Sequence, residues 1–254
     1  MPLLRAGHSR WYQRYMLAEG IVYLLSYRLT PPAFRRHLVD AIGLWARGRR
    51  QYRAWAPHLQ RTRDVIEHAM GAVPGRRTVA VLGAGPLFDL PVETLAQKFG
   101  RVLLIDIGHL WPAQSRIARL RNVETIWRDL APTGEAAPLA FLNSIPGLDW
   151  VISLNLVSQL AHTAREGTEA VAVDQHLHGL DALPVPVTLV TDTNYRLLDR
   201  SGDELEQFDL LYGCRLPDTS DTWLWNVAPF GEDAPDSRRV HSVSAFSDWH
   251  AARR

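Results

Sequence analysis

Two glycines and one aspartate stand where an open α/β sheet commonly holds a ligand. The apolar run Thr78–Leu82 ends in Gly83-Ala84-Gly85-Pro86, as a buried strand does when it leads into a ligand-binding turn. Glycine permits positive φ and lets a ligand approach the backbone with no Cβ in the way. Asp106 ends a second apolar run about 20 residues further on, where a carboxylate can accept hydrogen bonds from both hydroxyls of a ribose. These residues predict a ligand that contains a nucleoside.

The residues after the turn restrict the kind of nucleoside. A dinucleotide fingerprint, G-x-G-x-x-G, needs its last glycine three residues after Gly85, and that position is Phe88. Neither a Walker lysine nor its Ser/Thr follows, which argues against a phosphate loop. A ligand with a ribose but without phosphates fits the turn better than NAD, FAD or a nucleoside triphosphate.

The elements that would position these residues alternate between short apolar runs and helical stretches. Alternation of this kind predicts β-α-β units, a mostly parallel sheet and a doubly wound α/β fold. Apolar residues around Trp223 and Trp225, and from Val240 to Phe246, predict an antiparallel strand pair at the C-terminus. The expected strands are 78–82, 102–105, 123–127, 150–154 and 185–190, and the expected helices lie near 89–98, 110–121 and 165–182.

The N-terminal part reads as helix, because apolar residues recur at near-helical spacing between Trp11 and Met70. Thr30-Pro31-Pro32 supplies a cap and a proline start for a second helix, and Pro57 is expected to separate the second helix from a third. Residues 71–75, GAVPG, end that third helix. We therefore expect a helical segment over 1–75 and an α/β domain over 76–254.

Four motifs together resemble a known family. The stretches VAVLGAGPLFDLP, VLLIDIG, VETIWRDL and LDWVISLNLVSQL are similar, in order and approximate spacing, to the first four motifs of class I S-adenosylmethionine-dependent methyltransferases. The resemblance covers roughly residues 76–195 and implies a Rossmann-like fold with S-adenosyl-L-methionine as cofactor. Val81 stands where the family usually has an acid, and Leu87 stands where it often has a third glycine.

The resemblance also implies roles for individual residues. The turn would face the methionine part of the cofactor, Asp106 would bind the ribose, and Asn155 would border the methyl group. Residues after the third strand would contact the adenine. The implied cofactor-binding set is Gly83, Ala84, Gly85, Asp106, Asp129, Leu130 and Asn155.

Methyl transfer needs alignment of the acceptor and, for some acceptors, removal of a proton. Residues that follow the fourth and fifth strands are placed to line the methyl-facing pocket. His162 is the expected base, because the pKa of histidine lies near neutrality. The remaining residues of this set are Tyr195 as a second catalytic candidate, Gln159, Asp192 and Asn194 as substrate-binding candidates, and Ser158.

The predicted acceptor is a small molecule. The N-terminal helices are expected either to cover its site as a lid or to form an oligomer contact. Residues 1–77 hold 14 arginines against four acids, a net charge of +10, so the remainder of this +1 chain carries −9. These helices could therefore hold an RNA backbone, which makes an RNA methyltransferase the first alternative. A noncatalytic binding or scaffold protein is the second, favoured by Val81 and Leu87.

The composition bounds the remaining expectations. No apolar stretch approaches the roughly 20 residues that a membrane span needs, and the N-terminus lacks the features of a signal peptide, so we expect a cytoplasmic protein with no membrane partner and a capacity to form a homodimer. The single cysteine, Cys214, excludes an intramolecular disulfide and a cysteine-based zinc cluster. His176 and His178 diverge if they lie on a helix, and no metal site is predicted.

Overall fold

The computed structural model describes residues 7–130, 135 and 137–254, and the side chains of residues 7–16, 162 and 163 lie outside that description. The chain opens with α1 (Gly7–Leu29), a short 3₁₀ helix η1 (Pro32–His37), α2 (Leu38–Arg50) and α3 (Tyr52–Ala72). The prediction that Pro57 separates two helices is wrong. Pro57 lies inside α3, and the chain breaks at Gln51, whose φ of −99° and ψ of 18° leave the helical range.

The sheet has eight strands in the order β3-β2-β1-β4-β5-β8-β7, with β6 paired to β5. The strands β1 to β5 are parallel, whereas β6, β7 and β8 run antiparallel to their neighbours. This confirms the predicted mostly parallel sheet with an antiparallel C-terminal pair. The bounds are β1 (Thr78–Leu82), β2 (Arg101–Asp106), β3 (Val123–Trp127), β4 (Leu148–Leu154), β5 (Val187–Asp199), β6 (Glu204–Asp209), β7 (Thr222–Ala228) and β8 (Ser237–Phe246).

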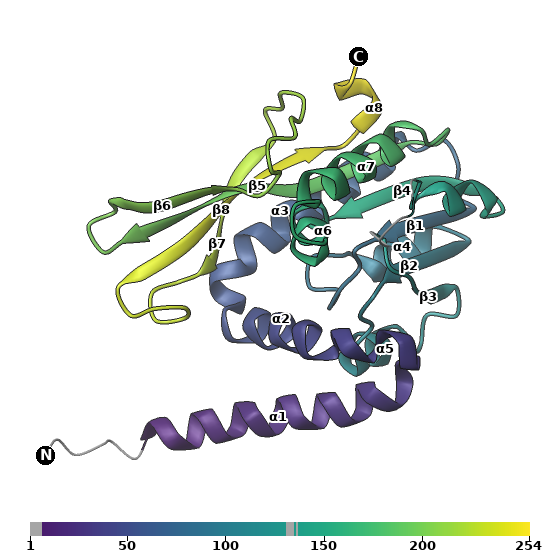
Figure 1. The fold of residues 1–254 in the computed structure, drawn as a ribbon. Helices are drawn as coiled ribbons and strands as arrows, with labels where there is room; N and C mark the ends of the chain where they lie inside the picture. Colours follow the sequence, from purple (N-terminus) through teal and green to yellow (C-terminus); the bar gives the residue numbers. More distant parts are fainter. Residues whose placement is uncertain (1–6, 131–134, 136) are drawn as a thin grey trace, which may run out of the picture.

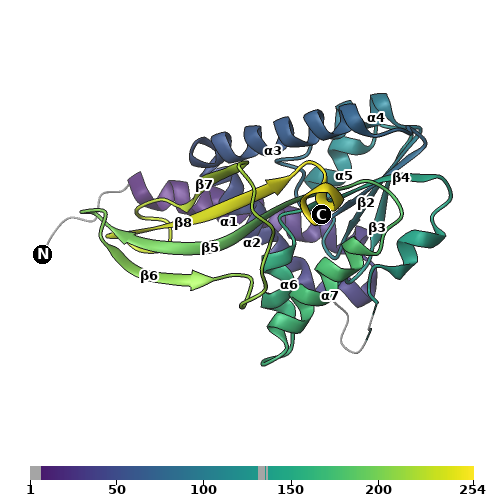
Figure 2. The ribbon, with the colours of Figure 1, turned by 90° about the horizontal axis from the view of Figure 1, so that it is seen from above.

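Helices cover both faces of the sheet, which gives three layers (Figure 2). One face carries α3, α4 (Val92–Lys98) and α5 (Trp111–Ile117), and the other carries α6 (Val157–Thr163) and α7 (Glu169–Asp181). A second 3₁₀ helix, η2 (Ala140–Ser144), precedes β4, and α8 (Trp249–Ala252) follows β8. The helix expected over 165–182 is α7, and α6 is an additional helix that the sequence did not indicate.

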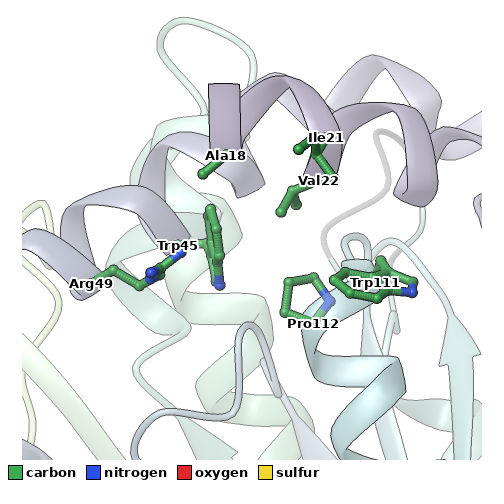
Figure 3. Close-up of a pocket in the computed structure, with 7 residues that line it drawn as sticks. All are labelled: Ala18, Ile21, Val22, Trp45, Arg49, Trp111 and Pro112. Atoms are coloured by element: carbon green, nitrogen blue, oxygen red, sulfur yellow. The ribbon is translucent and has the colours of Figure 1, made fainter. Parts of the chain in front are cut away.

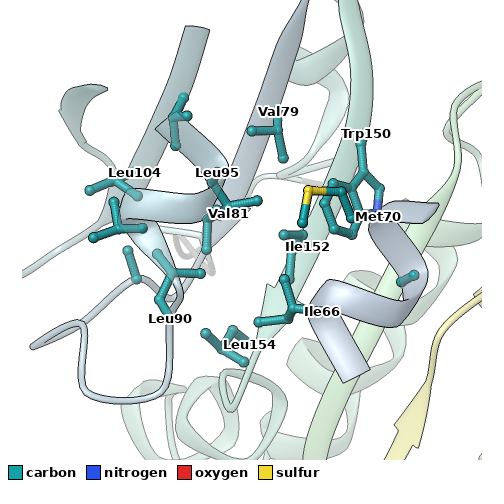
Figure 4. Packing of buried hydrophobic residues seen from close by; sticks show 14 of the residues in the cluster. Ile66, Met70, Val79, Val81, Leu90, Leu95, Leu104, Trp150, Ile152 and Leu154 are labelled. Carbon is teal, nitrogen blue, oxygen red and sulfur yellow. The ribbon is translucent and has the colours of Figure 1, made fainter. Parts of the chain in front are cut away.

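The apolar runs that predicted the strands form the core. On one face, residues of β1, β4 and α4 pack with the second half of α3, including Ile66 and Met70 (Figure 4). On the other face, β1, β2 and β5 pack with α6 and α7 through residues such as Leu160 and Leu177. The division into a helical segment over 1–75 and an α/β domain over 76–254 stays a prediction. In the structure, α3 shares one hydrophobic core with β1 and β4.

The strand β5 continues beyond the parallel part of the sheet. Its residues 187–190 pair with β4, and residues 194–198 pair with β6 on one side and β8 on the other. The strands β6, β5, β8 and β7 therefore form a twisted ribbon that extends from the sheet (Figure 1). We call these four strands the C-terminal ribbon. Its inner end lies beside the carboxyl end of β4, because Asn155 N donates to Val190 O over 2.8 Å.

Candidate functional site

The glycine turn after β1 has the backbone that the sequence predicted. Gly83 and Gly85 have φ values of 75° and 48°, in the left-handed region that favours glycine. A Cβ on Gly83 would lie 2.7 Å from Leu154 O, so the turn packs against the end of β4 too closely for a side chain. A Cβ on Gly85 would meet only Gly83 O, at 3.9 Å. The space beside Gly85 is therefore open to a ligand.

Asp106 joins the turn to the loop that follows β2. Its Oδ2 accepts a hydrogen bond from Gly85 N, and its Oδ1 accepts one from Gly108 N, both at 2.8 Å. Each carboxylate oxygen can accept a further hydrogen bond. Two backbone donors thus fix the carboxylate at the carboxyl ends of β1 and β2, with acceptor capacity left for a pair of hydroxyls.

The helix α2 lies over both of these loops. A Cβ on Gly48 would collide with the ring of Phe88, and a Cβ on Gly108 would lie 3.1 Å from Cβ of Ala41. Phe88, the residue that replaces the third dinucleotide glycine, is therefore a contact between the turn and α2. The N-terminal helices border the glycine turn and the Asp106 loop directly.

Asp129 and Leu130, the predicted adenine contacts, follow the end of β3. The side chain of Leu130 is buried and packs in the core with Ile105 and Leu139. Near the same strand end, His109 Nε2 lies 3.0 Å from Ile126 O, and its ring meets that of Trp127 edge-on at 4.7 Å. Burial lowers the pKa of His109, with Asp106 acting in the opposite direction.

Asn155, the predicted methyl-facing residue, takes part in a buried polar cluster. Its backbone has φ of 46°, and its Nδ2 donates to Asp89 Oδ2 over 2.7 Å and lies 3.3 Å from His58 Nε2. Its Oδ1 is buried with no hydrogen-bond partner. Burial raises the pKa of Asp89 and lowers the pKa of His58 to about 3. A buried, unpartnered acceptor oxygen is the kind of group that a bound ligand satisfies.

Two tryptophans of β7 hold His58 in place. Trp223 Nε1 donates to His58 Nδ1 over 3.1 Å, and the ring of Trp225 stacks on the His58 ring at 4.0 Å between centroids. Both tryptophans lie in the predicted C-terminal strand pair, and both contact this histidine of α3.

Asp192 binds a histidine that is distant in sequence. Ser158 Oγ donates to Asp192 Oδ1, and His241 Nδ1 to Asp192 Oδ2, each over 2.6 Å. Burial alone would raise the pKa of Asp192, but hydrogen bonds from His241 and Ser158 lower it overall. The carboxylate is therefore charged and orients the His241 ring at the inner end of the C-terminal ribbon.

The other predicted site residues divide between this site and its surroundings. Tyr195 stacks on His241 at 5.8 Å, and its hydroxyl donates to Glu206 Oε1 over 2.5 Å. Asn194 accepts from Ser242 Oγ over 3.1 Å. Gln159 donates to Asn155 O over 2.8 Å. His162, the predicted base, lies in α6, and its side chain is outside the described residues.

His58, Asp89 and His241 contact predicted site residues, although no sequence pattern indicated them. His58 falls three residues after Trp55 on a helix, where a buried histidine resembles any core position. His241 comes close to Asp192 only through the pairing of β5 with β8. The signal that could have indicated it is its position on the same strand face as Val243.

A cavity lies away from these residues. It has a volume of about 450 Å³ between α1, α2 and the start of α5, and its lining is mostly apolar (Figure 3). Arg49 lies over the ring of Trp45 at 4.9 Å. The lining residues are Ala18, Ile21, Val22, Trp45, Arg49, Trp111 and Pro112.

The histidines do not form a metal-binding group within the part of the chain that the structure describes. No set of three or more His, Cys, Asp or Glu residues is arranged there to hold a metal ion. His176 and His178 lie on α7 and diverge, as predicted. His176 is buried, with Nε2 2.9 Å from Ser153 Oγ, whereas His178 is exposed. None of the described helices is long and apolar enough to cross a membrane.

The chain is similar to several solved methyltransferase structures. A 1,6-didemethyltoxoflavin-N1-methyltransferase from Burkholderia thailandensis, bound to its substrate and S-adenosylhomocysteine, is 14% identical with a TM-score of 0.41, over 96% of this chain and 92% of that one. The N-methyltransferase NodS from Bradyrhizobium japonicum, in complex with S-adenosylhomocysteine, is 13% identical with a TM-score of 0.37, over 72% and 85%. DhpI in complex with S-adenosylhomocysteine is 15% identical with a TM-score of 0.41, over 81% and 94%.

No protein-family model matches the chain, and no curated protein matches its sequence. At these identities and TM-scores, similarity by itself assigns no activity, and the function has to follow from the residues of this chain.

Proposed function

We propose that the protein is an S-adenosylmethionine-dependent methyltransferase that acts on a small molecule. One arrangement carries the proposal: the Asp106 carboxylate, held by Gly85 N and Gly108 N, beside a glycine turn with open space at Gly85. A sugar with two neighbouring hydroxyls matches that carboxylate, and a ligand without phosphates matches a turn that has no lysine. The cofactor would supply an electrophilic methyl group on a sulfonium.

The roles of the surrounding residues follow the order of the strands. Asp106 would bind the ribose, and the turn Gly83-Ala84-Gly85 would hold the methionine part. Asp129 and Leu130 would border the adenine. Asn155, with its unpartnered Oδ1 at the end of β4, would lie nearest the methyl group. Gln159 and Asn194 would adjoin the substrate, and Asp192 would adjoin it through His241, the histidine that it binds. Tyr195 and His162 are the catalytic candidates that the sequence indicated.

The RNA alternative depends on the arginines of the N-terminal helices, and several of these have partners within the chain. Arg47 and Arg50 form ion pairs with Glu232 and Asp233, and Arg77 pairs with Asp149. Nucleic-acid binding therefore remains the lesser alternative. Homodimer formation and a cytoplasmic location also remain proposals, the first to be tested by sedimentation of the purified protein.

Calorimetric titration with S-adenosylmethionine and S-adenosylhomocysteine tests the cofactor. We expect both to bind, and Asp106→Asn to weaken each roughly ten- to a hundredfold, because the hydrogen bonds of a charged acceptor to the ribose are lost. Asparagine retains one acceptor for the backbone amides, and a circular dichroism spectrum checks the fold. Glu124→Gln, an exposed acid of β3, is the matched control and should bind as the wild type does. Failure of the wild type to bind either ligand would reject the methyltransferase assignment and leave a noncatalytic scaffold.

A further inference from the structure

Four aromatic rings form a single row across the C-terminal ribbon. In the strand register Phe208 of β6 lies opposite Tyr195 of β5, Tyr195 lies opposite His241 of β8, and His241 lies opposite Trp225 of β7. Residues that are directly opposite share a face of the sheet. The row therefore lies on one face of β6, β5, β8 and β7, which are neighbours in the C-terminal ribbon (Figure 1).

The rings of the row are in contact along its length. Centroid distances are 5.7 Å from Phe208 to Tyr195, 5.8 Å from Tyr195 to His241 and 5.8 Å from His241 to Trp225. The Trp225 end of the row is covered by α3, because His58 stacks on Trp225. The Phe208 end of the row is open: Phe208 is 38% exposed, and Tyr195 is partly exposed. The row is therefore exposed to solvent at Phe208 and partly exposed at Tyr195.

The histidine in this row is oriented for proton transfer. A carboxylate only accepts hydrogen bonds, so His241 Nδ1 must donate to Asp192, and the neutral ring presents an acceptor lone pair at Nε2. Ser158 holds the other oxygen of Asp192 over 2.6 Å. The side chain of Asp192 is 6% exposed and that of His241 is 13% exposed. The pair of Asp192 and His241 is therefore nearly buried, and His241 belongs to both the pair and the aromatic row.

We propose, on the basis of the methyltransferase function above, that the acceptor is an aromatic ring with a hydroxyl or ring N–H group that lies along Phe208 and Tyr195 and gives its proton to His241 Nε2. The acceptor atom forms the bond to the methyl carbon with its own electron pair. The pair of the broken carbon–sulfur bond stays on sulfur, and the acceptor proton passes through His241 to solvent. Asp192 and Ser158 are positioning residues that act through His241.

The charged groups around His241 come from four elements. Asp192 of β5 and His58 of α3 interact electrostatically with it, and Tyr195 stacks against it. Glu206 of β6 holds the Tyr195 hydroxyl, and Arg239 of β8 lies over the Tyr195 ring at 5.3 Å while pairing with Asp233. Only Asp192 makes a direct ion-pair contact with His241 among the described side chains.

Binding of 2-naphthol and of its saturated analogue decahydro-2-naphthol, with S-adenosylhomocysteine present, tests the aromatic site. We expect 2-naphthol to bind more tightly, and Tyr195→Leu or Phe208→Leu to weaken it roughly two- to tenfold through loss of ring contacts. Tyr52→Leu, at an exposed tyrosine of α3, is the control and should leave binding unchanged. Equal binding of the two naphthols, or unchanged binding in both ring variants, would overturn the proposal and leave the rings as packing of the ribbon.

The absorbance of bound 4-nitrophenol tests the role of His241 without turnover. The wild type should ionise the bound phenol at a lower pH than His241→Gln does, because an imidazolium stabilises the phenolate. Once an acceptor that the enzyme methylates is known, the dependence of kcat on pH can be measured. Asp192→Asn should move its acid limb to lower pH. Identical ionisation of the bound phenol in the wild type and His241→Gln would reject His241 as the base.

The two proposals can fail separately. If S-adenosylhomocysteine binds and neither 2-naphthol nor 4-nitrophenol does, only the acceptor proposal fails. If none of the three ligands binds, the methyltransferase function fails as well.

Discussion

Leu87 shows what a single residue of the turn contributes. Its φ of 61° is in the left-handed region, which costs a non-glycine residue about 1–2 kcal/mol. Its side chain is nevertheless 1% exposed and packs in the core beside β1 and α4. The backbone at position 87 thus favours glycine, whereas the burial of the side chain favours leucine. Leucine at this position therefore combines a strained backbone with a fully packed side chain.

This balance predicts an unusual order of stabilities at position 87. Both Leu87→Ala and Leu87→Gly lose a buried side chain and should be destabilised by about 2–5 kcal/mol. Leu87→Gly should be the more stable of the two by about 1 kcal/mol, because only glycine relieves the positive φ. Urea unfolding of the two variants measures the difference. An alanine variant at least as stable as the glycine variant would show that the backbone at position 87 carries no strain.

At the scale of elements, α2 is fastened to the loop between β7 and β8. Glu232 accepts hydrogen bonds from Arg50 and Gln51, each over 2.7 Å, and Arg47 pairs with Asp233 over 3.0 Å. The Glu232 side chain is 8% exposed. Burial opposes its charge, but the hydrogen bonds from Arg50 and Gln51 lower its pKa. These contacts connect α2, which lies over the glycine turn, to the C-terminal ribbon with its aromatic row.

Glu232→Gln should therefore destabilise the fold by about 1–3 kcal/mol, because two arginines lose a shared, nearly buried carboxylate. It should also speed proteolytic cleavage within residues 229–236. Glu93→Gln is the matched control: its pair with Arg116 is a surface pair, with the carboxylate 48% exposed, and should cost less than about 1 kcal/mol. Equal effects of the two substitutions in urea unfolding would mean that the contact with α2 holds the loop no better than a surface pair does.

Local patterns predicted the elements whose cause is local. The runs 78–82 and 123–127 match β1 and β3. The strand β1 is a buried apolar run, whereas β3 is an edge strand whose residues are partly exposed. Asp106 was predictable because it ends such a run. The contact between Asp192 and His241 was not, since the residues are 49 apart in sequence and meet only through an antiparallel pairing with a register shift between Asp192 and Asn194. The break at Gln51 had no Gly or Pro to mark it.

At the scale of the whole molecule, buried histidines couple folding to pH. Burial lowers the pKa of His58 to about 3 and that of His176 to about 4, from an ordinary value of 6.5, and it lowers the pKa of His109 as well. Between these values and pH 6.5 the unfolded chain binds more protons than the folded chain, so acid favours unfolding. Asp89 acts in the opposite sense, because its raised pKa makes the folded state bind a proton more readily.

The share of the free energy of unfolding that comes from these histidines should therefore be fully present above about pH 6.5, and it should fall as the pH drops toward 4. Each buried histidine contributes up to about 1.4 kcal/mol per pH unit, so His176 alone contributes on the order of 3 kcal/mol over that range. His176→Gln keeps a polar group for Ser153 but cannot titrate, and it should reduce the slope by the share of one histidine. His178→Gln, at an exposed position two residues along the same helix, should leave the slope unchanged, and Asp89 contributes equally to both variants. Urea unfolding at a series of pH values measures all three slopes; parallel curves for the wild type and His176→Gln would show that His176 takes up its proton without unfolding the chain.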